Sequence, residues 1–264
     1  MSQIPNLFPN YAAAIRSVPA PALSDPRTVA ELRMDKLTVG NREIEMIYSP
    51  FDHTNEGARI VIVGMTPGKQ QAVNALKAAR AALARGAPLD RAAEEAKVFA
   101  SFSGSMRSNL VRLLDAVGVA RFLDLETTAK LWNGRADIAH FTSALRYPVF
   151  VDGDNWSGNP DMIRNPQMRR WLEQYTGAEL AEMPSAVFVP LGPKVTAALE
   201  HLAAIGKIDQ SRILAGLPHP SGANNERIAY FLGDKPAHLC SPKTKTAVRD
   251  TARDALCARV SQLS

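Results

Sequence analysis

The sequence contains only two cysteines, Cys240 and Cys257. Two cysteines cannot form the disulfide framework of a small secreted protein, and they cannot supply the four thiolates of an iron–sulfur cluster. No apolar run approaches the roughly eighteen residues that a membrane span requires, and the first residues lack a basic segment followed by an apolar one. We therefore expect a reduced, cytoplasmic protein that does not enter a membrane.

The charge balance is only mildly basic, with 31 lysines and arginines against 26 aspartates and glutamates and a net charge of +5. This excess agrees with an anionic partner such as DNA, although many cytosolic enzymes share it. Since 46% of its 264 residues are hydrophobic, the chain is able to bury a full core. We expect one domain spanning residues 1–264, and we find no internal repeat.

Short apolar runs alternate with helical patterns along most of the chain. The predicted strands are 60–63, 137–145, 186–191 and 213–217, and the predicted helices are 70–85, 90–98, 106–117, 120–132, 166–175, 194–205 and 244–262. Apolar strands separated by helices indicate a parallel sheet with right-handed crossovers. We expect an α/β fold with three α/β/α layers around a central, mostly parallel, four-stranded sheet.

The first forty residues predict a helical N-terminal extension, with helical apolar spacing in 10–17 and 26–34. Gly40-Asn41 follows the run 36–39 and precedes the run 42–48, which predicts a small β-hairpin. We expect the functional core to span 59–233 and the helix 244–262 to close the fold.

The last predicted strand ends in the polar turn Pro218-His219-Pro220-Ser221-Gly222. A proline on each side of His219 restricts the backbone, which favours a fixed orientation of the imidazole over a mobile loop. The Ser221 hydroxyl is placed to cap the helix that follows. A histidine in such a turn more often makes only local hydrogen bonds than takes part in chemistry, so a second motif has to decide between the two interpretations.

The second motif is Gly64-Met65-Thr66-Pro67-Gly68, which follows the unbroken β-branched run 60–63 and precedes an alanine-rich helix. A strand, a turn containing glycine and a helix form the usual surroundings of a ligand site at the carboxyl end of a parallel strand. Because the carboxyl ends of parallel strands share one edge of the sheet, we expect this turn and the turn around His219 to line one cleft.

The two motifs, GMTPG and HPSGANN, resemble those of the uracil-DNA glycosylase superfamily, and most closely its single-strand-selective monofunctional and mismatch-specific branches. The segments SFSGSMRSNLVRLLDAVG (101–118) and AVFVPLGPKVTAAL (186–199) resemble two further parts of that superfamily, in the same order. The resemblance covers about 59–233. It implies a uracil-DNA glycosylase-like fold and a monofunctional, monomeric DNA glycosylase without cofactor, which hydrolyses the N-glycosidic bond of a flipped-out uracil or related damaged base and leaves an abasic site.

The resemblance also implies roles for individual residues. His219 would donate a hydrogen bond to the charge that develops on the base oxygen, a contribution of roughly 3–4 kcal/mol for comparable donors. Phe102 would stack on the flipped base. The turn residues expected at the base or its phosphate are Gly64, Met65, Pro67 and Gly68, and those expected at the DNA are Ser221, Gly222, Ala223, Asn224, Asn225 and Arg227. Lys69, at the start of a helix, is a further candidate for a phosphate contact.

Two positions depart from the superfamily pattern. Thr66 stands where the superfamily usually has Asp, Asn or Glu to position or activate the attacking water, and a hydroxyl can hold water but cannot act as a base at neutral pH. Asp52, or else Asp152 or Asp154, is a candidate replacement, although an aspartate in a loop more often caps that loop. We therefore take His219, Thr66 and Asp52 as the candidate catalytic residues.

The other departure lies on the middle strand, where the superfamily has an asparagine that reads the pyrimidine edge. The matching region here is His140-Phe141-Thr142-Ser143. Thr142 and Ser143 are the candidates for contact with the base, and His140 is an alternative.

Other functions are also compatible with the sequence. The main alternative is a superfamily member that binds uracil-containing, damaged or single-stranded DNA without releasing a base. A small-molecule nucleoside hydrolase is another, and its activity would lack the steep salt dependence of DNA binding. The sequence does not favour a P-loop, because only three residues separate Gly64 from Gly68 and Gln70 follows Lys69. The histidines lack metal-ligand spacing, so we expect no metal, and no lysine is clearly placed for Schiff-base chemistry.

Overall fold

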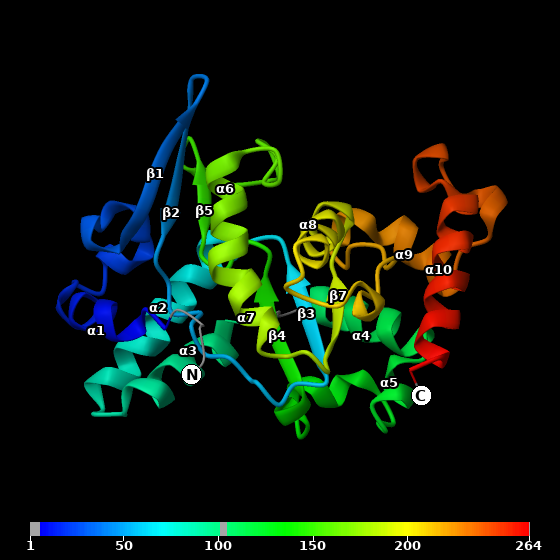
Figure 1. The fold of residues 1–264 in the computed structure, drawn as a ribbon, viewed down its shortest axis with the longest axis horizontal. Coiled ribbons are helices and arrows are strands. Elements are labelled where there is room, and N and C mark those ends of the chain that lie inside the picture. Colours follow the sequence, from blue (N-terminus) through cyan, green and yellow to red (C-terminus); the bar gives the residue numbers. More distant parts are fainter. Residues whose placement is uncertain (1–5, 101–104, 264) are drawn as a thin grey trace.

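The computed structural model describes residues 6–100 and 105–263 of the chain. Its central parallel sheet has the strand order β4-β3-β7 (Figure 1). β3 spans Ile60–Gly64, β4 spans Ala139–Ser143 and β7 spans Val187–Pro190. The three strands run in register, and each occurs where the sequence predicts a strand. The chain is therefore an α/β protein with a parallel sheet at its centre.

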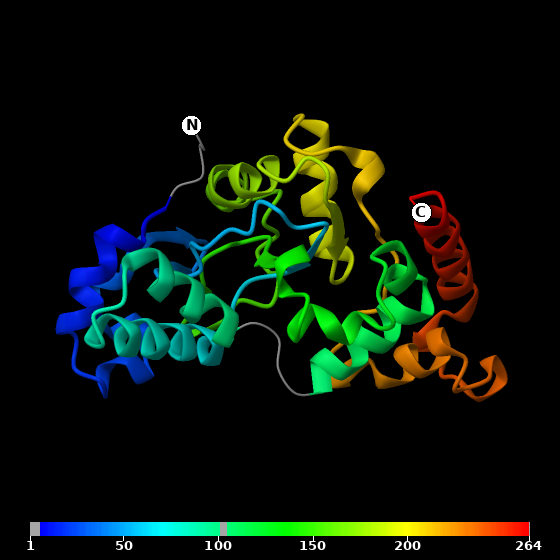
Figure 2. The same ribbon diagram turned by 90° about the horizontal axis from the view of Figure 1, so that it is seen from below.

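Both faces of the parallel sheet are covered by helices. Along β3, Val61 and Val63 pack into one hydrophobic core, whereas Ile60 and Ile62 pack into another, and all four side chains are fully buried. The core on the Val61 side receives α1 (Phe8–Ser17), α2 (Lys69–Ala84), α3 (Leu89–Ala100), α6 (Pro166–Trp171), α7 (Gly177–Ala181) and α8 (Pro193–Ala204). The core on the Ile60 side receives α4 (Ser105–Ala116), α5 (Val119–Phe122), α9 (Asn225–Leu232) and α10 (Thr246–Ser261). Helices therefore pack on both sides of the central sheet (Figure 2), as expected of an α/β protein.

The predicted fourth parallel strand, 213–217, is reduced to a single bridge between Ile213 and Phe188 of β7. One ladder hydrogen bond forms, from the N–H of Leu214 to the carbonyl of Phe188 at 2.8 Å. Gly216 then adopts a φ of +127°, which is not a strand conformation, and a Cβ there would lie 3.1 Å from the carbonyl oxygen of Ala252 in α10. The prediction of four regular strands is therefore wrong, because the chain bends away under α10.

A second, antiparallel sheet has the order β1-β2-β5-β6. Its strands are β1 (Arg33–Val39), β2 (Arg42–Ile47), β5 (Val149–Val151) and β6 (Asp154–Asn155). The predicted hairpin β1–β2 is confirmed, whereas the β5–β6 hairpin is not among the predicted elements. Asp152 and Gly153 form its turn with φ values of 52° and 89°. An Asp-Gly pair is a strong local signal for such a turn, so the pattern was available in the sequence.

Two predicted helices are interrupted. Residues 26–34 form two short 3₁₀ turns, Pro26–Thr28 and Ala30–Leu32, before β1 begins. In 120–132, α5 ends before Asp124, whose φ of 59° is left-handed, and a 3₁₀ turn follows. By contrast, the helix predicted at 166–175 continues through a π-helical turn into α7.

Neither cysteine takes part in a disulfide: Cys240 and Cys257 are free, partly exposed thiols. Within the part of the chain that the structure describes, no helix combines the length and the apolar character needed to cross a membrane.

Candidate functional site

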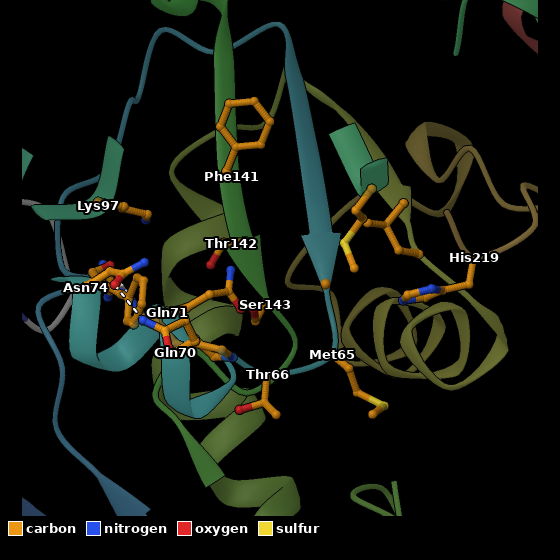
Figure 3. Close-up of a pocket in the computed structure, with 16 residues that line it drawn as sticks. Met65, Thr66, Gln70, Gln71, Asn74, Lys97, Phe141, Thr142, Ser143 and His219 are labelled. Carbon is orange, nitrogen blue, oxygen red and sulfur yellow. Dashed lines mark hydrogen bonds between the residues drawn. The ribbon is translucent and has the colours of Figure 1, made fainter. Parts of the chain in front are cut away.

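A cavity of about 680 Å³ opens at the carboxyl ends of the parallel strands, and we call it the sheet-edge cavity (Figure 3). Its lining residues are Phe51, Gly64, Met65, Thr66, Pro67, Gln70, Gln71, Asn74, Lys97, Met106, Phe141, Thr142, Ser143, Arg146, Leu191 and His219. The turn after β3 and the turn that carries His219 both contribute, which confirms the prediction that they line one cleft. His219 and Lys97 lie on opposite sides of it.

His219 is held in one tautomer by the main chain. The N–H of Ser221 donates a hydrogen bond to Nδ1 of His219 at 3.2 Å, so in the neutral ring the proton lies on Nε2. Partial burial lowers the pKa of His219, which favours this neutral form near pH 7. Among the described residues, Nε2 has no hydrogen-bond partner. The ring points from its turn toward the end of β3 (Figure 3), so this side of the cavity presents an available N–H donor.

The turn around His219 is fixed by distant parts of the chain. Asn109 of α4 donates a hydrogen bond from Nδ2 to the carbonyl of Pro220 at 3.0 Å. Gly192, which precedes α8, lies against the imidazole, and a Cβ there would be 3.7 Å from its Cδ2 atom. Pro218 and Pro220 are both buried. The expected orientation of His219 therefore depends on packing as well as on the two prolines.

Thr66 lines the cavity, but its hydroxyl is already occupied. Oγ1 donates to the carbonyl of Tyr147 at 3.1 Å and accepts from the N–H of Val149 at 3.2 Å. A hydroxyl has one proton to donate, so Thr66 has none left for a water or a substrate. The Thr66 hydroxyl therefore has a structural role, which joins the turn after β3 to the segment before β5, and its catalytic role stays a prediction.

The polar residues of β4 differ in their availability. Thr142 donates its hydroxyl proton to Oε2 of Glu179 at 2.7 Å. His140 accepts from the N–H of Asn55 at Nδ1, 3.3 Å away, and donates from Nε2 to Oε1 of Glu179 at 2.8 Å, which leaves no ring nitrogen to read a base. The hydroxyl of Ser143 has no partner among the described residues. Of the candidates on this strand, Ser143 is the one whose polar group remains available to a ligand.

Beneath the cavity lies a buried charged cluster that the sequence interpretation did not identify. Glu179 of α7 is fully buried, with Lys97 Nζ at 3.0 Å and Arg146 Nη2 at 3.5 Å from Oε1. We call these three residues, together with His140 and Thr142, the Glu179 cluster. Its members come from α3, β4, the segment after β4, and α7, so no local sequence pattern joins them.

The cluster shifts the pKa values of its members. Burial lowers the pKa of Lys97 to about 8, even though Glu179 favours the ammonium. Burial and the nearby Lys97 lower the pKa of His140 to about 4. Burial alone would raise the pKa of Glu179, but the charges of Arg146 and Lys97 lower it well below its usual value. Near neutral pH the cluster therefore holds a carboxylate, two cations and a neutral imidazole.

Three amide side chains of α2 also line the cavity and were not predicted. They are Gln70, Gln71 and Asn74. Gln70 donates from Nε2 to Oδ1 of Asn74 at 2.8 Å, and Gln71 accepts from the N–H of Gly68 at 3.1 Å. Their signal was present in the sequence, because they form a polar patch at helical spacing within an alanine-rich helix.

Asp52 does not line the sheet-edge cavity, which contradicts its predicted catalytic role. Its buried carboxylate accepts hydrogen bonds from the hydroxyl of Tyr48 at 2.6 Å, the hydroxyl of Tyr147 at 2.9 Å and the N–H of Leu7 at 2.8 Å. Burial, and after it the charge of Asp52, raises the pKa of both tyrosines. Asp52 therefore anchors the N-terminal extension to the core.

The other predicted aspartates are also outside the cavity. Asp152 lies in the exposed β5–β6 turn, where it accepts from the N–H of Glu43 at 2.8 Å and pairs with Arg42 at 3.0 Å. Asp154 is exposed in β6. Within the described chain, no carboxylate lines the cavity.

Lys69 and Gly68 are engaged in packing instead of facing the cavity. Lys69 pairs through Nζ with Asp25 at 2.9 Å. The pKa of Asp25 falls to about 2, mainly through its hydrogen bond with Arg27 and also through Lys69. The main-chain N–H of Lys69 donates to Asn155 of β6 at 2.8 Å, and Gly68 packs beside the same side chain. Lys69 therefore already has an anionic partner within the protein, and its contact with a DNA phosphate stays a prediction.

The predicted DNA-binding loop, 221–227, lies at the surface next to His219. Gly222, Ala223 and Asn225 are exposed. Ser221 does not cap the helix with its hydroxyl, as the sequence predicts; instead its Oγ accepts from Nδ2 of Asn224 at 3.1 Å. Asn224 in turn accepts from Arg227 at 2.7 Å. A chain of hydrogen bonds therefore runs from His219 through this loop.

Phe102, the predicted stacking residue, lies outside the described residues. No group of three or more His, Cys, Asp or Glu side chains within 6–100 and 105–263 is placed to hold a metal ion.

Comparison with known proteins finds a relative in Bacillus subtilis (strain 168) that is described as the uncharacterized protein YoxB. The two sequences are 34% identical over 196 residues, which is 73% of this chain and 77% of that protein. No family model matches the sequence. No solved structure matches it either.

Proposed function

This chain belongs to the family of the Bacillus subtilis protein YoxB, and we propose that it is a DNA base-excision glycosylase with a uracil-DNA glycosylase-like fold. The observation that carries the proposal is the position of His219. Its protonated Nε2 points into a cavity that is also lined by the Gly64–Pro67 turn, at the carboxyl edge of a parallel sheet. The two motifs that resemble the superfamily thus contribute to one site.

In this proposal a nucleotide flips out of the DNA and its base enters the sheet-edge cavity. As the N-glycosidic bond breaks, the sugar becomes oxocarbenium-like and the base leaves with negative charge. The Nε2–H of His219 donates to the base carbonyl on which that charge develops. A neutral donor suits this role because it binds the charge without a change of protonation state, and donors of this kind contribute about 2.7–4 kcal/mol.

The rest of the cavity favours a base rich in carbonyl groups. Lys97 and Arg146 line its wall, and Glu179 behind them balances one of the two positive charges, so the wall keeps a net positive charge. The main-chain N–H groups of Met65 and Thr66 donate to no described residue, so they add donors beside the hydroxyl of Ser143. Uracil differs from cytosine by a carbonyl in place of an amino group, and such a wall prefers the carbonyl.

The described residues of the cavity include no carboxylate that could act as a base toward the attacking water. Thr66 has no free proton to donate, and the carboxylates predicted to replace it lie elsewhere. General-base assistance is typically worth about 10²–10⁴-fold in rate. We expect a slow enzyme in which neutral side chains such as Gln70 and Asn74 only position the water.

The same observation favours a second candidate function, a protein that binds uracil-containing, damaged or single-stranded DNA in this cavity without releasing the base. It requires the cavity and His219 but not an activated water. The two candidates therefore make the same prediction for binding and different predictions for product.

Base release from labelled oligonucleotides separates them. Single-stranded and duplex DNA with one uracil is incubated with the protein and then cleaved at abasic sites by hot alkali, with a thymine oligonucleotide as the blank. We expect strand scission at the uracil, with a rate at least 100-fold lower in His219→Gln. The control His238→Gln changes an exposed histidine and should keep the wild-type rate. Tight uracil-dependent binding without scission would support the second candidate, and neither scission nor preferential binding would refute both.

A further inference from the structure

Arg227 and Arg249 lie on two neighbouring helices beyond the exposed loop that follows His219. Arg227 is in the first turn of α9 and Arg249 is in the first turn of α10, and the two helices pack together (Figure 1). The charge of Arg227 acts on Arg249 strongly enough to lower the pKa of Arg249, after the larger effect of burial. We call these two residues the arginine pair.

Arg227 is held in place by the loop. It donates from Nη1 to Oδ1 of Asn224 at 2.7 Å and from Nη2 to the carbonyl of Lys243 at 3.3 Å. Asn224 is bonded to Ser221, whose N–H is bonded to the imidazole of His219. Arg227 is therefore connected to His219 through the hydrogen bonds of Asn224 and Ser221.

The side chain of Arg249, unlike that of Arg227, makes no hydrogen bond to another described residue. Its Nε is buried without a hydrogen-bond partner, and its guanidinium makes no ion pair with any described residue. It also lies in the first turn of a sixteen-residue helix, where the helix dipole disfavours a cation. A guanidinium with an unused buried donor, close to a second guanidinium, is suited to bind an anion.

The neighbouring carboxylates are engaged elsewhere. Glu226 accepts from Lys235, Ser241 and Thr244. Asp250 accepts from the hydroxyl of Tyr230 at 2.7 Å and pairs with Arg253 at 3.4 Å. Exposed Lys243 and Lys245 lie close by in the chain and add further positive charge. No carboxylate of the described residues is left to neutralise the arginine pair.

We propose that Arg227 and Arg249 together bind one backbone phosphate of the DNA strand that lies against the 221–227 loop. The choice of DNA rests on the proposed function, since the pair adjoins the loop next to the sheet-edge cavity. A planar guanidinium presents paired donors that match phosphate oxygens. A phosphate held here fixes the loop through Arg227 and Asn224, and with it the turn that carries His219.

The salt dependence of DNA binding tests this site directly. Affinity for a uracil-free labelled duplex is measured by fluorescence anisotropy between 50 and 200 mM NaCl for the wild type, Arg249→Gln and Arg249→Lys. Each phosphate contact contributes about 0.9 to the slope of log K against log salt. We expect Arg249→Gln to reduce the slope by about 1, so that its loss of affinity relative to the wild type differs roughly 3- to 4-fold between the two salt concentrations. Arg249→Lys should retain most of the slope.

Arg259→Gln is the matched control, because Arg259 lies near the other end of α10 and its guanidinium is bonded to the carbonyls of Ser211 and Gln210. Its slope should equal that of the wild type. The double variant Arg227→Gln/Arg249→Gln should lose less affinity than the sum of the two single variants, since both side chains bind one phosphate. Equal slopes for wild type and Arg249→Gln, or the same decrease in Arg259→Gln, would overturn the proposal.

This outcome is independent of base release. If the protein excises uracil but the slope does not depend on Arg249, only the phosphate site is refuted. If the slope depends on Arg249 but no abasic site forms, the glycosylase proposal fails and the phosphate site remains.

Discussion

His219 and His140 have the same tautomer but differ in what their Nε2–H groups contact. In each, Nδ1 accepts a hydrogen bond from a main-chain N–H, of Ser221 at 3.2 Å and of Asn55 at 3.3 Å, so that the proton of the neutral ring lies on Nε2. In His140 that proton is donated to Glu179 at 2.8 Å, and the ring is buried. In His219 it has no partner among the described residues and faces the sheet-edge cavity.

The difference shows that protonation state alone does not mark a functional histidine. Burial lowers the pKa in both residues, yet only His219 has a donor left for a ligand. His140 belongs to a region whose hydrogen bonds are satisfied internally and that supports the floor of the site. We therefore expect substitutions in the two regions to separate stability from function.

The largest effect on stability is expected at Glu179. Glu179→Gln leaves the buried cations Lys97 and Arg146 without their carboxylate, and the loss of one partner of a buried ion pair costs about 3–5 kcal/mol. Urea unfolding followed by circular dichroism measures this change. Glu200→Gln, at an exposed position of α8, should be nearly neutral. Equal stabilities of the wild type and Glu179→Gln would show that the cluster is not held together by this carboxylate.

Substitution of His219 should lower activity, whereas substitution of His140 should lower stability. His219→Gln is expected to lower uracil release 100- to 1,000-fold, or about 2.7–4 kcal/mol in activation free energy, with little change in unfolding. His140→Gln should destabilise the fold and affect base release only in proportion to the unfolded fraction. Excision rates and urea midpoints of the same preparations provide both measurements. The comparison fails if the two variants change the same quantity.

Acid should destabilise the protein through His140. The folded-state pKa of about 4 lies below the ordinary value of 6.5, so the unfolded state binds more protons in this window. The free energy of unfolding is therefore maintained above pH 6.5 and decreases as the pH falls toward 4, by up to on the order of 3 kcal/mol. His219 adds a smaller contribution of the same sign. Thermal midpoints between pH 7 and 4 measure the slope, which should be shallower in His140→Gln; an unchanged slope would assign it to other groups.

The smallest effect is expected at Thr66. Thr66→Val leaves the N–H of Val149 without its partner and removes the bond to the carbonyl of Tyr147, which costs about 1–3 kcal/mol. Thr66→Ser should restore the stability because it keeps the hydroxyl. If Thr66 held the attacking water, Thr66→Val would instead reduce base release by the 10²–10⁴-fold typical of proton-transfer catalysis at unchanged stability. Excision assays on both variants distinguish the two roles.

The central part of the fold was predictable because its signals are local. The β-branched run 60–63 and the glycine turn after it define a buried parallel strand, and the prolines around His219 restrict its turn. The rule that parallel strands end at one edge then brought the two turns together. The strand at 213–217 was misjudged because the close approach of α10 at Gly216 is not visible in the local pattern.

The assignment of site residues was less successful, and the reason lies in distant hydrogen bonds. Lys69, Asp52 and Thr66 each had a residue type suited to a functional role. In the structure Lys69 pairs with Asp25, which is 44 residues away in the sequence, and Asp52 accepts from Tyr147, 95 residues away. The hydroxyl of Thr66 bonds to the main chain of Tyr147 and Val149, 81 and 83 residues away. Conversely, Lys97 and Glu179 are 82 residues apart and carry no mutual signal.

The sequence by itself determined the places of the three regular parallel strands and which histidine lies in a rigid turn, because short-range sterics and hydrophobic pattern fix both. Only the tertiary structure decided which polar groups remain available to a ligand. A side chain has a limited number of donors and acceptors, and whether they are occupied depends on neighbours that folding brings from distant parts of the chain.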